Sequence, residues 1–207
     1  GAHAFLILGK FTHPDSLIGT FRSGIHYTAE WAAAKDSSYQ LPDPYTLTTV
    51  KDEKPMDFSF PNTEDDMISI LDSTYTGKIK IVQIMGTWCP NCWDETEMLK
   101  EYFKENQTTE VEWISLAFER YEDKNKVLSQ LKKYKQKMGL HHEVLWAGNY
   151  KKSEAEKSLP QVSKIMSFPT LLILDKNNHI RKIHTGFSGP ATQEYHTFKK
   201  EFFDIIE

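Results

Sequence analysis

Two cysteines, Cys89 and Cys92, are the residues of this 207-residue chain whose type and spacing best suit covalent chemistry. They are the only cysteines in the sequence, and Pro90 and Asn91 separate them. A single pair cannot form a framework of several structural disulfides, so the two cysteines must act within their own short segment of the chain. Three interpretations are open: thiol-disulfide exchange, a zinc site and an inert packed pair.

The residues around the pair favour disulfide exchange. A β-branched run over residues 79–85 predicts a buried strand, a turn follows, and Pro90 suits the first position of a helix. The free N–H groups and the dipole of a helix start favour a thiolate at Cys89, whereas Cys92 lies one turn inside. We therefore expect an exposed Cys89 to attack a partner disulfide and Cys92 to resolve the mixed disulfide.

Zinc binding is a weaker interpretation of the same pair. Zinc usually takes four protein ligands, and the remaining ones would have to be histidines such as His141 and His142. We therefore predict neither a metal nor a cofactor at this site.

Composition excludes two other classes of function. The formal net charge of -4 provides no general basic field, so nucleic acid is not an expected partner. No apolar run approaches the ~20 residues that a membrane-spanning helix needs. The chain begins at Gly1 rather than at methionine, so we expect any targeting segment or membrane anchor to lie upstream.

Strands and helices alternate from residue 79 onward. The predicted elements, in chain order, are a strand 79–85, a helix 90–104, a strand 111–118, a helix 122–138, a strand 143–146, helical turns within 153–166, strands 170–174 and 180–185, and a helix 191–206. This order predicts an α/β sandwich: a central mixed β-sheet flanked by helices, with one antiparallel hairpin. Before it, residues 56–60 alternate between two prolines and predict a short edge strand.

The segment from Val82 to Cys92 resembles the active-site segment of the thioredoxin superfamily. The Trp-Cys-Pro-x-Cys unit that ends it, followed by Glu95, is similar to the TlpA/ResA branch of bacterial thiol-disulfide oxidoreductases. A second motif, Ser167–Thr170, stands before a strand where the superfamily carries a cis-proline. The resemblance implies a thioredoxin-like domain at residues 51–207 with an extra helix-strand insertion. Residues 1–50 are then an N-terminal extension or the remnant of an upstream domain.

The resemblance also implies how a partner protein binds. A cis Pro169 leaves the backbone before it free to pair with an extended substrate segment, and Trp88, Pro90 and Phe168 are expected to line the same groove. The alternative for Pro169 is an ordinary proline at the start of a strand. An aromatic residue at 168 departs from the family pattern, so substrate preference does not carry over.

Glu95 is the expected proton acceptor for Cys92. Many cytosolic thioredoxins place a buried acid where this chain has Gln83, and an amide does not titrate. Glu95 lies three residues after Cys92, on the same helix face, and matches the glutamate of TlpA/ResA relatives. The alternative is that Glu95, with Asp94 and Glu97, only stabilises the start of the helix.

These features predict a thiol-disulfide oxidoreductase that acts on protein disulfides. The resemblance implies a reductant in an extracytoplasmic bacterial compartment, served by an upstream thiol electron donor. One alternative is a thioredoxin-like module that binds polypeptides without redox turnover. The other is a thiol peroxidase, but the Pro-x-x-x-Thr/Ser-x-x-Cys context of peroxiredoxin nucleophiles does not precede Cys89.

Overall fold

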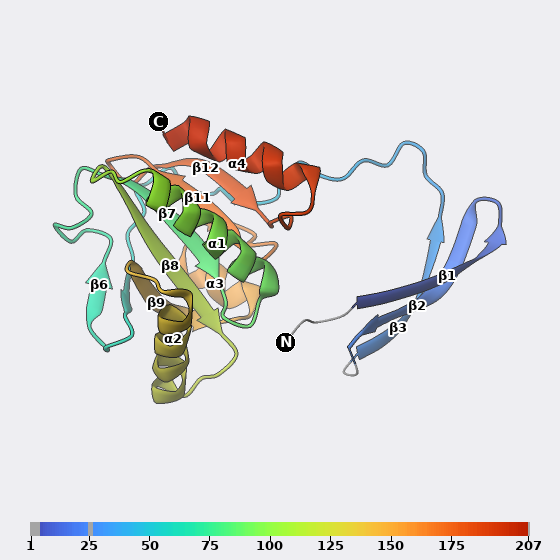
Figure 1. The fold of residues 1–207 in the computed structure, drawn as a ribbon, viewed down its shortest axis with the longest axis horizontal. Helices are drawn as coiled ribbons and strands as arrows, with labels where there is room; N and C mark the ends of the chain where they lie inside the picture. Colours follow the sequence, from blue (N-terminus) through green and yellow to red (C-terminus); the bar gives the residue numbers. More distant parts are fainter. Residues whose placement is uncertain (1–4, 25–26, 207) are drawn as a thin grey trace. The chain divides into compact units, whose positions relative to one another are not determined.

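The computed structural model describes residues 5–24 and 27–206, in two units, 1–41 and 42–207. The smaller unit is an antiparallel sheet of β1 (Phe5–His13), β2 (Ser16–Ser23) and β3 (Tyr27–Ala34), in the order β1-β2-β3 (Figure 1). Gly9, Gly19 and Trp31 form one row across the three strands. The indole occupies the space over both glycines, where a Cβ would lie within 3.0 Å of the ring.

The larger unit is built on a five-stranded mixed sheet in the order β12-β11-β7-β8-β9. Its strands are β7 (Ile79–Met85), β8 (Val111–Glu119), β9 (Glu143–Asn149), β11 (Thr170–Leu174) and β12 (Ile180–Thr185). β7, β8 and β9 are parallel, whereas β11 is antiparallel to both β7 and β12. The predicted mixed sheet, hairpin and helix-strand insertion are confirmed, and the fold is thioredoxin-like.

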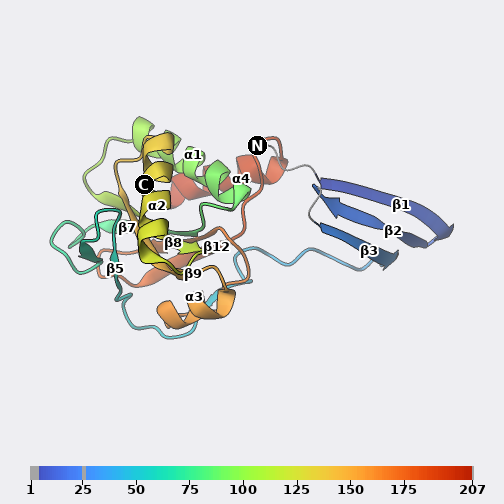
Figure 2. The same cartoon turned by 90° about the horizontal axis from the view of Figure 1, so that it is seen from below.

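Helices cover both faces of this sheet. They are α1 (Pro90–Glu105), α2 (Lys124–Met138), α3 (Lys152–Ser158) and α4 (Gln193–Ile206). α1 and α4 lie on one face and α3 on the other (Figure 2). Tyr102 of α1 packs against Phe202 of α4, with ring centroids 5.3 Å apart, and Trp93 of α1 packs against Tyr134 of α2 at 5.1 Å. No helix in the described part of the chain is long and apolar enough to cross a membrane.

The strand predicted at residues 56–60 is wrong in its bounds. β5 comprises Ser59–Pro61 and, among the described residues, pairs with β6 (Met67–Ser69) alone. Met56 and Phe58 are buried, and the N–H of Met56 donates to the carbonyl of Asn178. Their alternation therefore reflects packing against the core rather than pairing within a sheet.

Residues 42–50 begin the larger unit and pack against its later elements. β4 (Thr49–Val50) pairs with β10 (Val162–Ser163), and the Thr48 hydroxyl donates to the carbonyl of Lys164 at 2.9 Å. The hydroxyl of Tyr45 donates to the carboxylate of Glu201 on α4. This stretch thus packs against β10 and α4.

Candidate active site

Cys89 is the N-cap residue of α1, where the chain leaves β7 through a short turn. Its N–H donates to the carbonyl of Gly86 at 3.0 Å, which closes that turn. Both cysteines are free thiols, so the structure describes the dithiol. Cys89 is 6% exposed and Cys92 is fully buried. The expected order of exposure holds, but the expectation of an exposed Cys89 is wrong because its side chain is part of the buried core.

The two thiols differ in acidity. The hydrogen bond from the Cys92 thiol lowers the pKa of Cys89, and the N–H groups of Cys92 and Asn91 add to this effect against burial. Burial raises the pKa of Cys92 well above its usual value, and the neighbouring Cys89 raises it further. The site therefore contains one thiol that ionises more easily than an ordinary cysteine and one that resists ionisation.

Phe168 lies beside Cys89. The Phe168–Pro169 peptide bond is cis, and the Cys89 thiol donates to the Phe168 carbonyl at 3.4 Å. The Phe168 ring is 8% exposed and packs edge-on against Trp88, with centroids 5.5 Å apart. Pro90 is exposed at the start of α1. The residues predicted to form the partner groove are thus brought together around the first cysteine.

Two residues that the sequence motifs do not reveal extend this surface. The guanidinium of Arg120 lies 4.9 Å from the centre of the Trp88 ring and 5.9 Å from that of Tyr150. Both residues are exposed. They follow the ends of β8 and β9, and parallel strands bring such ends to the same edge of a sheet as the dithiol.

Glu95 lies in the core behind the dithiol. It is fully buried, and its Oε2 accepts a hydrogen bond from Gln83 Nε2 at 2.9 Å. The same nitrogen lies 3.3 Å from the carbonyl oxygen of Cys92. Oε1 of Glu95 has no hydrogen-bond partner among the described residues. Burial raises the pKa of Glu95 to about 8, although the hydrogen bond from Gln83 opposes this shift.

The pKa of Glu95 places its proton exchange close to neutrality, as general acid-base chemistry requires. The helical spacing predicts that Glu95 and Cys92 share one side of α1, and both are fully buried. From the sequence alone, Gln83 stands out only as a departure from the family pattern. In the fold it is the hydrogen-bonding partner of the carboxyl group.

Glu119 fixes the turn that carries Cys89. Its Oε1 accepts from the Thr87 N–H at 2.7 Å, and its Oε2 accepts from the Thr87 hydroxyl at 2.9 Å. The Thr87 carbonyl in turn accepts from the indole N–H of Trp93 at 2.9 Å. Burial raises the pKa of Glu119, and the hydrogen bonds from Thr87 oppose that shift. A buried side chain at the end of β8 thus positions the loop that precedes the nucleophile.

A metal site would need several ligand side chains close together within residues 5–24 and 27–206. No group of three or more His, Cys, Asp and Glu side chains in these ranges is placed to hold an ion. His142, named above as a conceivable ligand, instead stacks on Trp113 and bonds to Ser115.

Comparison with known proteins agrees with the fold. The AhpC/TSA family matches residues 50–183. A DsbF homologue from Corynebacterium diphtheriae aligns with a TM-score of 0.57 at 15% identity, over 81% of this chain and 99% of its own. A secreted thiol-disulfide isomerase from Corynebacterium glutamicum aligns with a TM-score of 0.57 at 16% identity, over 82% and 95%.

A third solved structure is the putative thiol:disulfide interchange protein DsbE from Chlorobium tepidum. It aligns with a TM-score of 0.56 at 14% identity, over 77% of this chain and 99% of its own. No curated protein sequence matches the chain significantly. At these identities the structural similarity establishes the fold.

Proposed function

This chain belongs to the AhpC/TSA family, and we propose that it is a thiol-disulfide oxidoreductase that reduces disulfides of partner proteins through Cys89 and Cys92. The observation that carries the proposal is the arrangement of the dithiol. Cys89 caps α1 beside the Phe168 carbonyl, Cys92 is buried one turn later, and a buried Glu95 lies behind them.

The reaction needs no group other than these side chains and the partner disulfide. The Cys89 thiolate attacks one partner sulfur, the partner S–S bond breaks, and the leaving thiolate takes up a proton. Cys92 then gives its proton to Glu95 and attacks the Cys89 sulfur. A Cys89–Cys92 disulfide forms as the bond between Cys89 and the partner breaks. The second partner sulfur leaves as a thiolate and takes up a proton, so that two electrons have passed to the partner. An upstream thiol donor restores the dithiol.

Glu95 supplies the base for the second step. A thiol in apolar surroundings resists ionising, and Cys92 is fully buried. A carboxyl group whose pKa is about 8 exchanges its proton near neutrality. Glu95→Gln should leave the attack by Cys89 intact and slow resolution by about 10²-fold.

The partner groove lies on the surface formed by Trp88, Pro90, Phe168 and Pro169. An extended segment of the partner would pair with the backbone before Pro169, as in strand addition. The proposed location is extracytoplasmic, in the bacterial periplasm or envelope. This part of the proposal draws on the family resemblance and on a structural neighbour described as secreted.

Trapping of partner proteins tests the assignment of the two cysteines. Cys92→Ser should accumulate mixed disulfides with a disulfide-bonded substrate such as insulin, whereas Cys89→Ser should accumulate almost none. Equal trapping by both variants contradicts the assignment. A polypeptide-binding module predicts that Cys89→Ser binds partners as well as the original chain does and that neither protein reduces insulin. A thiol peroxidase predicts thiol-dependent consumption of peroxide.

The reduction potential tests the direction of electron flow. Equilibration of the Cys89–Cys92 pair against a glutathione series yields the potential, and each 30 mV corresponds to about 1.4 kcal/mol for this two-electron couple. A value nearer to about -270 mV, as in thioredoxin, supports a reductant. A value nearer to about -120 mV would make the protein an oxidant.

A further inference from the structure

A continuous row of hydrogen bonds leads from Glu95 across the sheet to His142. Gln83 on β7 donates to Glu95 at 2.9 Å, and its Oε1 lies 3.0 Å from the hydroxyl of Ser115. Ser115 stands directly opposite Gln83 on β8, and its hydroxyl lies 2.9 Å from Nε2 of His142, just before β9. Glu95, Gln83 and Ser115 are all fully buried, so water does not compete for these bonds.

The direction of each bond follows from the chemistry of the groups. In its ionised form, which is the form that takes up a proton, Glu95 only accepts hydrogen bonds. The amide nitrogen of Gln83 must then face Glu95, and the amide oxygen faces Ser115. The single hydroxyl proton of Ser115 is donated to that oxygen, which leaves Ser115 to accept the Nε2–H of His142. Every donor in the row then points toward Glu95.

Thr96 does not replace Ser115 in this row. Its hydroxyl donates to the Cys92 carbonyl at 2.8 Å, which is shorter than its 3.2 Å approach to the Gln83 oxygen. Because a hydroxyl has one proton, Ser115 is the donor that holds the amide oxygen of Gln83.

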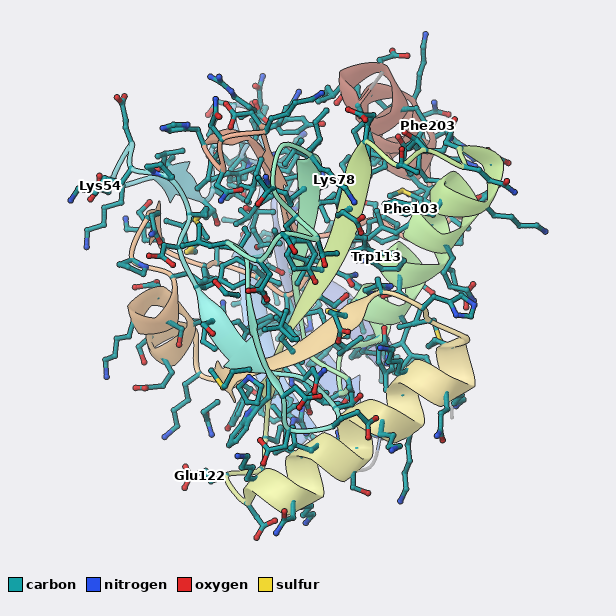
Figure 3. The ribbon with its side chains drawn as sticks, turned by 90° about the vertical axis from the view of Figure 1, so that its left-hand side faces the viewer. Lys54, Lys78, Phe103, Trp113, Glu122 and Phe203 are labelled. Atoms are coloured by element: carbon teal, nitrogen blue, oxygen red, sulfur yellow. The ribbon has the colours of Figure 1, made fainter. Side chains whose placement is uncertain are left out.

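His142 is held in place by an aromatic stack at a surface groove. Its ring lies flat on Trp113, with centroids 3.5 Å apart, and Trp113 stacks on Phe103 of α1 at 5.7 Å. Figure 3 shows Phe103 and Trp113 close together beside α1. These side chains line a groove of about 880 Å³ that also includes Lys78 and His142. The far end of the row is therefore a partly buried ring that lines a surface groove.

We propose that Ser115 and His142 are positioning residues of the dithiol site, which hold the Gln83 amide with its nitrogen toward Glu95. Neither contacts a reacting sulfur atom. Without them the amide oxygen loses its donor, and only the contacts of the nitrogen with Glu95, Thr96 and the Cys92 carbonyl oppose a half-turn that would present the oxygen to Glu95. Only the protonated acid can bond to that oxygen, so Glu95 would no longer be free to accept the proton of Cys92. This inference rests on the proposed role of Glu95.

Several ionisable groups face the row and contribute to its response to pH. Cys89 and Cys92 lie beside Glu95 on α1, and Tyr134 approaches from α2. Burial lowers the pKa of His142 well below its usual value, and Lys135 and His141 act in the same direction. The imidazole is therefore neutral near pH 7 and has one N–H to donate.

The test measures resolution of a mixed disulfide in single turnovers of the whole chain between pH 5.5 and 9. Ser115→Ala is expected to slow resolution about tenfold at pH 7 and to move the midpoint of its pH profile upward by about one unit, as expected for loss of a bond that supports a carboxylate. The rate of the first attack by Cys89 should not change. Ser115→Thr, which keeps the hydroxyl, should restore the profile.

His142→Phe is a second variant that keeps the aromatic stack and removes only the donor. It should shift the profile in the same direction, and the matched change His141→Phe at the exposed neighbouring position should not. The double variant with Ser115→Ala should resemble Ser115→Ala alone, because the row is already broken. Additive shifts in the double variant would overturn the inference.

The outcomes separate this inference from the proposed function. If Glu95→Gln resolves mixed disulfides slowly but Ser115→Ala and His142→Phe keep the original pH profile, only the positioning role fails. If Glu95→Gln itself resolves at the original rate, the role of Glu95 as base fails, and the positioning role fails with it.

Discussion

Glu95→Gln should stabilise the protein while it impairs resolution. Glu95 is fully buried, and burial raises its pKa from 4.5 to about 8. Glutamine has nearly the same shape, can accept the same hydrogen bond from Gln83 and carries no charge. The substitution therefore removes the cost of placing an ionisable group in the core and leaves the packing almost unchanged.

The sign and size of the effect follow from proton linkage. Above pH 4.5 the unfolded chain loses the Glu95 proton, whereas the folded chain keeps it until about pH 8. The folded state thus binds more protons in this window, so the free energy of unfolding falls as pH rises through it. Each pH unit costs about 1.4 kcal/mol, which amounts to about 3 kcal/mol by pH 7 and about 5 kcal/mol above pH 8. Glu95→Gln avoids this loss.

Urea unfolding of the reduced protein between pH 4.5 and 7.5 measures the effect. The difference in unfolding free energy between Glu95→Gln and the original chain should be near zero at pH 4.5 and about 3 kcal/mol at pH 7. Other titrating groups occur in both proteins and cancel. Glu97→Gln, at an exposed position of the same helix, is the control and should show a difference that stays within about 0.5 kcal/mol at every pH. A difference for Glu95→Gln that does not change with pH would refute the claim that burial keeps this carboxyl protonated.

Three further predictions concern Phe168, the turn that Glu119 holds and the N-terminal residues. Phe168→Ala should destabilise the fold by about 3–5 kcal/mol and raise the rate at which iodoacetamide alkylates Cys89 several-fold. An unchanged alkylation rate would show that the Phe168 ring does not shield the thiol. Glu119→Ala removes both hydrogen bonds to Thr87. It should lower the unfolding free energy by about 2–3 kcal/mol and slow insulin reduction. Insulin reduction at the original rate would argue against a role of Glu119 in holding the turn. Chains that begin at Pro42 or at Lys51 should both keep dithiol chemistry. The chain that begins at Lys51 loses the β4–β10 pairing and should melt at least about 5 °C lower than the chain that begins at Pro42. Equal melting temperatures would contradict a stabilising role of that pairing.

Elements that depend on neighbours in the sequence follow directly from local patterns. The predicted strand 79–85 and the helix start at Pro90 match β7 and α1, because a β-branched run and a proline at the first helical turn act over a few residues. The pairing of Cys92 with Glu95 on one side of α1 likewise follows from helical spacing. The sheet of residues 5–34 was not predicted, because its packing depends on Trp31 covering glycines of two other strands.

The sequence by itself determined which residues are candidates for the chemistry: a lone pair of cysteines at a strand-to-helix junction, a glutamate one turn further on, and a second motif with a proline before a strand. Only the tertiary structure decided how exposed Cys89 is and which side chains form hydrogen bonds with Glu95 and Gln83. The backbone carbonyl of Phe168 reaches the Cys89 thiol from a distant loop, and Gln83, Ser115 and His142 meet because β7, β8 and β9 are neighbours in the sheet. Burial and hydrogen-bond partners are set by which strands lie side by side, and contacts between residues far apart in the chain leave no periodic signal in the sequence.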